Sequence, residues 1–169
     1  MQVTRRQILA LSATGAAVAM VGAGVALRAW WERAPGRDYR LLDDTEGSIV
    51  QALAAAAFPA GGEVDVDGSA MGLDHFFDEL LGHMEATAAH ELRILLRVLD
   101  AGPLWSHRST FRSLGASDQR AVLGAWLDDD LLEVRSAAMG VLVLLGSGWA
   151  IHPRVSAVFA RWHQCGFGS

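Results

Sequence analysis

The sequence predicts an all-α protein, a compact bundle of about five to seven short helices. Three observations lead to this prediction. Apolar residues recur at intervals of three and four along the chain after residue 44, no segment alternates with period two, and clusters of Gly, Pro and Asp separate the apolar segments. A length of 169 residues with 51% hydrophobic residues fits one domain and one unusually apolar segment.

The apolar segment lies at the N-terminus, directly after two arginines. Arg5 and Arg6 precede Ile8 and Leu9, and the run 8–27 contains no charged residue. Adjacent arginines before a weakly hydrophobic run are typical of a twin-arginine export signal, which directs folded proteins across the inner membrane. We therefore expect the twin-arginine export machinery to recognise this chain and its body to lie in the periplasm.

The fate of the signal, residues 1–31, is open between two alternatives. Cleavage after the small residues Gly24-Val25-Ala26 would release the body. Retention is the other, because the 20 residues of 8–27 suffice to cross a hydrocarbon core of about 30 Å and would anchor the protein in the inner membrane. Arg28, Trp30 and Trp31 would then lie at the membrane interface.

The body is expected to begin after a linker, residues 32–44, and to occupy 45–169. Helices are expected from Thr45 to the Phe58-Pro59 stop, over 71–84, over 86–99, from an N-cap at Ser117, over 131–145, and from His152-Pro153 to Trp162. Gly146-Ser147-Gly148 is expected to end the fifth of these. That helix is apolar nearly all round after Ala137, which indicates a position in the core or against a partner.

Charge and cysteine content exclude several functions. From Glu32 onward the chain carries eleven arginines and nineteen acidic residues, so a nucleic acid is not expected as a partner. Cys165 is the only cysteine, and no CxxC spacing exists to hold zinc, an iron–sulfur cluster or haem. No catalytic triad, nucleotide-binding glycine loop or paired-carboxylate motif is present either. We expect neither a catalytic residue nor a cofactor in this chain.

Two acidic segments resemble metal sites. The loop Glu63–Gly68 with Asp74 places oxygen donors as a calcium loop does, but it has Glu at the first position, Asp at the last and Ala70 at the eighth. His75, Glu79 and His83 share one helix face at four-residue spacing. The departures in the loop and the solvent-facing position of the helix face favour solvated surfaces over metal sites in both.

The order of features resembles the small (gamma) subunit of membrane-bound gluconate 2-dehydrogenase. The likeness comprises the twin-arginine start, a helix ending in Phe58-Pro59, the Gly/Asp loop, the run Phe76–Leu81, and Phe111, Leu114, Arg120, Leu123 and Trp126 in the spacing FxxLxxxxxRxxLxxW. The resemblance implies a noncatalytic subunit bound to a large FAD-containing dehydrogenase of the glucose-methanol-choline type, often with a cytochrome c subunit. It implies no catalytic residue in this chain.

The function expected from the sequence is therefore that of an accessory subunit, which helps the large subunit fold and crosses the membrane with it. Aromatic residues in excess of a small core are the interface candidates: Phe58, Trp105, Trp149 and Trp162. Two alternatives stay open. One is a free-standing periplasmic domain that binds a metal or another ligand, and the other is an enzyme whose site is assembled across helices.

Overall fold

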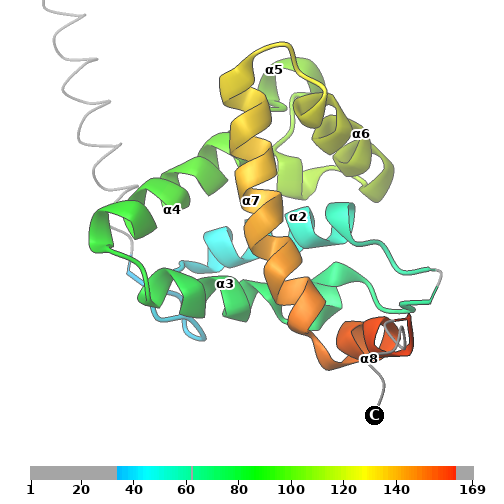
Figure 1. Ribbon diagram of the computed structural model, residues 1–169. Coiled ribbons are helices and arrows are strands. Elements are labelled where there is room, and N and C mark those ends of the chain that lie inside the picture. The colour runs from blue at the N-terminus through cyan, green and yellow to red at the C-terminus, as the bar shows by residue number, and fades with distance from the viewer. Residues whose placement is uncertain (1–33, 62, 163–169) are drawn as a thin grey trace, which may run out of the picture. The chain divides into compact units, whose positions relative to one another are not determined.

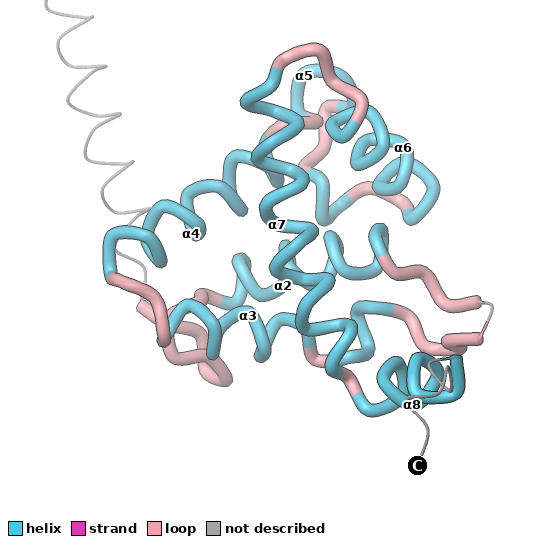
Figure 2. Tube along the Cα trace, viewed as in Figure 1, coloured by secondary structure: helices cyan, strands magenta, loops and turns pink. Residues whose placement is uncertain are grey.

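The computed structural model describes residues 34–61 and 63–162 (Figure 1). The chain divides after Ala34 into two units, and the second unit holds every described helix. These are α2 (Asp44–Ala57), α3 (Leu73–Gly82), α4 (Ala86–Ala101), α5 (Leu104–His107), α6 (Ala116–Leu127), α7 (Leu132–Ile151) and α8 (Pro153–Trp162), with short 3-10 turns η1 (Gly68–Met71) and η2 (Phe111–Ser113). The described residues contain no strand, which confirms the all-α prediction (Figure 2). The export signal, Arg5, Arg6, Ile8 and Leu9, lies outside them, as does Cys165.

α2 is the helix that contacts most of the others, among them α3, α4, α6 and α7. It begins with a capping box, in which the Asp43 side chain accepts the Glu46 backbone N–H at 2.7 Å and the Glu46 carboxylate accepts that of Asp43 at 2.9 Å. Its core-facing side chains are at most 1% exposed: Ile49, Val50, Leu53 and Ala54. Its last residue is Ala57, and Phe58 is its C-cap directly before Pro59, so the helix stops where predicted.

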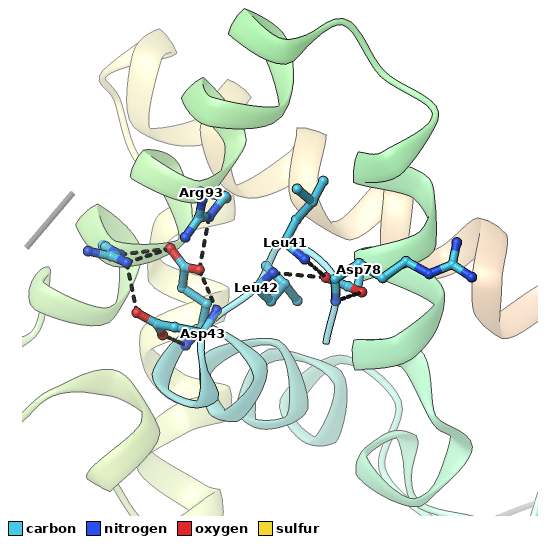
Figure 3. Close-up of polar contacts among 8 residues, drawn as sticks. Leu41, Leu42, Asp43, Asp78 and Arg93 are labelled. Atoms are coloured by element: carbon cyan, nitrogen blue, oxygen red, sulfur yellow. Dashed lines mark hydrogen bonds and ion pairs between the residues drawn. The ribbon is translucent and has the colours of Figure 1, made fainter. Parts of the chain in front are cut away.

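The segment expected to be a linker is partly built into the body. Its described residues up to Asp43 are not helical, but the Asp78 carboxylate on α3 accepts three successive backbone N–H groups from them. The donors are Arg40 at 2.7 Å, Leu41 at 2.9 Å and Leu42 at 2.8 Å (Figure 3). Leu42 is fully buried. The packed body therefore begins before Thr45, because one carboxylate satisfies the backbone of an otherwise irregular segment. We call residues 39–43 the strap.

A buried ion cluster joins the start of α2 to α4 (Figure 3). The Arg97 guanidinium donates to Glu46 Oε1 at 2.8 Å and to Asp43 Oδ2 at 2.9 Å, and Arg93 Nε donates to Glu46 Oε2 at 3.0 Å. Glu46 is fully buried and Arg97 is 5% exposed. A buried charge without an opposite charge beside it is strongly destabilising. The cluster therefore favours the packing in which Arg97 of α4 faces the capping box of α2.

α7 is longer than the sequence indicates. The predicted stop at Gly146-Ser147-Gly148 is wrong, because the helix continues through these residues to Ile151. Gly148 lies where α7 crosses α3, and a methyl group at this position would overlap the Phe76 ring. Glycine is therefore used here for close helix packing, and the contact outweighs its low helix propensity.

Smaller differences occur between α4 and α6. The predicted N-cap of α6 at Ser117 is wrong: the cap is Gly115, no side chain satisfies it, and Ser117 lies in the first turn. The one-turn helix α5 was not predicted either, since Leu104–His107 is too short to show a period. The helix over 86–99, the 131–145 core of α7 and the last helix all form as expected.

Candidate partner interface

Within the described residues no group of three or more His, Cys, Asp or Glu side chains is placed to hold a metal ion. The Asp67 side chain instead accepts the Ser69 backbone N–H at 2.9 Å and starts η1. Asp74, the last position of the calcium-like loop, binds other protein groups, so the loop does not gather its oxygens around a centre.

Asp74 belongs to a polar cluster that holds the strap on α2 and α3. Its Oδ2 accepts the Tyr39 hydroxyl and the Gln51 amide, both at 2.7 Å. Burial raises the pKa of Asp74, but these hydrogen bonds and one from the His75 backbone outweigh burial and leave the pKa below its usual value. Burial, and then the Asp74 carboxylate, raise the pKa of the Tyr39 hydroxyl. The neutral Tyr39 hydroxyl therefore donates a hydrogen bond to an ionised Asp74 carboxylate, and this bond holds the start of the strap against α3.

The predicted helix face of His75, Glu79 and His83 forms on α3, but its side chains do not converge. The His75 ring lies beside that of Tyr39, with centroids 5.2 Å apart. His83 Nδ1 lies 2.8 Å from the carbonyl oxygen of Glu79 in its own helix. All three residues are exposed.

The predicted interface aromatics have different positions. Phe58 stacks on Trp149 with ring centroids 5.1 Å apart, and Trp149 meets the edge of Phe159 at 6.1 Å. Phe58 and Trp149 are half-buried against the core, so much of their bulk is used inside the fold. Trp105 is 97% exposed on α5. The side chain of Trp162 lies outside the described residues.

Four of the exposed large apolar residues lie on α7, which was not among those candidates apart from Trp149. Leu132, Met139, Val143 and Ile151 are 62%, 48%, 62% and 68% exposed and lie along one side of α7. Ser136, Gly140 and Ser147, also exposed, lie between them. We call these seven residues the α7 face. They follow steps of three and four, so they form one stripe along the helix. The sequence signal was present in the all-round apolar composition of α7, which by itself could not show which side faces outward.

The α7 face carries no charge and is poorly covered by the other residues that the structure describes. No charged residue occurs between Arg135 and Arg154, and Glu133 is the last acidic residue of the sequence. Only 22% of the most apolar stretch of α7 is buried. By length and composition α7 could also cross a membrane. One side of α7 packs into the core of the folded body, however, through Val141 and Leu145.

Comparison of the chain with protein-family models, with curated proteins and with solved structures gives no match. The resemblance to gluconate 2-dehydrogenase small subunits therefore stays a prediction, supported by the residues quoted above. In the described residues the surface has an uncharged apolar face on a helix and no metal cluster.

Proposed function

We propose that this chain is a noncatalytic accessory subunit that binds a flavin-dependent dehydrogenase subunit in the periplasm or at the inner membrane and is exported together with it. The partner carries FAD, and a cytochrome c subunit can complete the complex. This chain contributes folding, stability and the export signal. The proposal combines the twin-arginine start with the family resemblance and with one structural observation.

That observation is the exposure of the α7 face. Large apolar side chains that are about half or more exposed along about five turns of one helix are costly in water, and exposed apolar patches mark protein interfaces. The opposite side of α7 is well packed: Ala138, Val141 and Leu145 are at most 1% exposed. The exposed side is therefore not a result of poor folding, and a partner subunit that covers α7 accounts for it.

The test compares two matched substitutions in the chain co-expressed with the flavin-binding subunit that co-purifies with the wild-type chain. Val143→Asp places a charge on the α7 face, and Val98→Asp places the same charge on α4, where the valine is 57% exposed. We expect Val143→Asp to separate the flavoprotein from this chain in size-exclusion chromatography and Val98→Asp to leave the complex intact. Dissociation by Val98→Asp alone would place the interface at α4 and refute the role of α7.

Export is tested separately. Arg5→Lys together with Arg6→Lys should leave the flavin-binding subunit in the cytoplasm, because the partner would cross only with this chain's signal. A flavoprotein that still reaches the periplasm would disprove co-export. A monomer that contains stoichiometric metal and no partner would instead support the free-standing binding domain.

A further inference from the structure

A groove lies beside the α7 face, where α2, α6 and α7 meet. It has a volume of about 380 Å³, and its lining includes Phe58, Arg120, Gly124, Leu142 and Gly146. All of its lining residues except Arg120 are apolar or glycine. Gly146 follows Val143 by three residues and Met139 by seven, so the groove opens at the edge of the α7 face. A partner that covers this face also covers the groove.

Arg120 gives the groove its one charge. It is exposed, and among residues 34–61 and 63–162 it has no hydrogen bond or ion pair from its guanidinium. Arginines of the core behave differently, since Arg93 and Arg97 bind the buried Glu46. A guanidinium beside an apolar groove is complementary to a carboxylate that arrives with an apolar side chain.

Two glycines keep the groove open at a cost to the helices. Gly124 lies in α6 and Gly146 in α7, and glycine inside a helix is less stable than alanine by about 0.5–1 kcal/mol. At Gly124 an added Cβ meets nothing within 4 Å, and at Gly146 it meets only Phe58 at 3.9 Å. Packing within the described residues therefore does not require glycine at either position, in contrast to Gly148. What an added side chain would change is the depth of the groove.

We propose that this groove is the anchor point of the partner subunit, and that it receives a bulky apolar side chain next to an Asp or Glu that pairs with Arg120. The inference rests on the proposed function and specifies the site. The uncharged lining accepts the apolar side chain, and the arginine selects the acidic neighbour. Docking would exclude water from the guanidinium, which strengthens its pairing with a carboxylate.

The first experiment places the photo-crosslinking residue p-benzoylphenylalanine at position 139 in the co-expressed complex and maps the cross-linked peptide by mass spectrometry. Met139 is exposed beside the groove and does not line it, so the bulky probe leaves the groove open. We expect a partner peptide with a large apolar residue within a few positions of an Asp or Glu. A peptide without an acidic residue, or a cross-link to lipid, would overturn the proposal.

The second experiment measures affinity in the same complex. Arg120→Glu should raise the dissociation constant at least about tenfold, and exchanging the mapped acid for Arg should restore binding to that variant. Arg37→Glu is the matched control, because Arg37 is exposed and does not line the groove. Gly124→Leu should fill the groove, weaken the complex and leave the isolated chain at least as heat-stable as wild type. Gly82→Leu, also open, is its control.

The outcomes separate the two proposals. If wild type and both groove variants bind equally well while Val143→Asp dissociates the complex, the groove has no anchoring role and the accessory function stands. If wild type forms no complex, both proposals are wrong. The anchor is supported if Arg120→Glu and Gly124→Leu weaken binding while Arg37→Glu and Gly82→Leu do not, and if exchanging the mapped acid for Arg restores binding to Arg120→Glu.

Discussion

Arg97→Met tests whether the buried ion cluster holds the strap and α2 on α4. The substitution keeps most of the side-chain volume and removes the guanidinium that binds Glu46 at 2.8 Å and Asp43 at 2.9 Å. Glu46 would keep Arg93 and the Asp43 backbone N–H, and the Asp43 carboxylate would lose Arg97 in a site that is 6% exposed. Removing one partner of a buried ion pair costs about 3–5 kcal/mol. A domain of this size has a free energy of unfolding of about 5–15 kcal/mol, so the loss is a large fraction of the total.

The assay is urea unfolding of the purified chain, followed by far-UV circular dichroism and by tryptophan fluorescence. Arg112→Met is the matched control, because Arg112 forms a looser ion pair with Asp100 at 3.6 Å and its side chain is 33% exposed. Asp100 is buried but would keep the Arg112 backbone N–H at 3.0 Å, and the guanidinium that is removed is partly solvated, so the control should lose much less stability. Equal losses in both variants, or a loss below about 1 kcal/mol for Arg97→Met, would refute the importance assigned to the cluster.

Three further predictions concern single side chains. Asp78→Ala leaves three backbone N–H groups of the strap without their acceptor and should lower the free energy of unfolding by at least about 3 kcal/mol. Proteolysis at residues 36–42 should become faster. Unchanged proteolysis would show that other contacts hold the strap. The pKa of Asp74 is lowered in the folded state, so its ionised form stabilises the fold at pH values above the pKa of an unfolded Asp, which is about 4. The difference in free energy of unfolding between wild type and Asp74→Asn should therefore shrink as the pH falls through the folded-state pKa of Asp74. A difference that stays constant with pH would contradict this. Gly140→Ala should stabilise the isolated chain by about 0.5–1 kcal/mol, because the added Cβ meets no other atom within 4 Å. Gly148→Ala should lower the Tm, because the added Cβ overlaps the Phe76 ring. Equal effects of the two substitutions would refute the packing role of Gly148.

The helices themselves could be predicted because they depend on local signals. The spacing of Ile49, Leu53 and Ala56 and the stop at Pro59 are sufficient for α2, and similar periods give α3 and α4. The end of α7 could not be predicted in the same way. Gly146 and Gly148 look alike in sequence, but one faces a groove and the other contacts Phe76, and only tertiary packing distinguishes them.

The candidate interface was harder to predict than the fold. Aromatic content pointed to Phe58 and Trp149, yet these rings stack on each other against the core. The exposed residues of α7 are aliphatic and small, and periodicity cannot assign an outward face to a helix that is apolar all round. The strap was missed for a related reason. The contacts of Asp78 with Arg40, Leu41 and Leu42 join residues 36 to 38 positions apart, a separation that leaves no local pattern.

The central claim is that another protein, carrying flavin, covers the α7 face. The most direct measurement is the mass and the flavin absorbance of this chain purified under native conditions from the cells that produce it. We expect a complex much larger than 18.1 kDa that contains flavin and releases it with the large subunit when Val143→Asp is introduced. A flavin-free particle with the mass of the single chain would contradict the account.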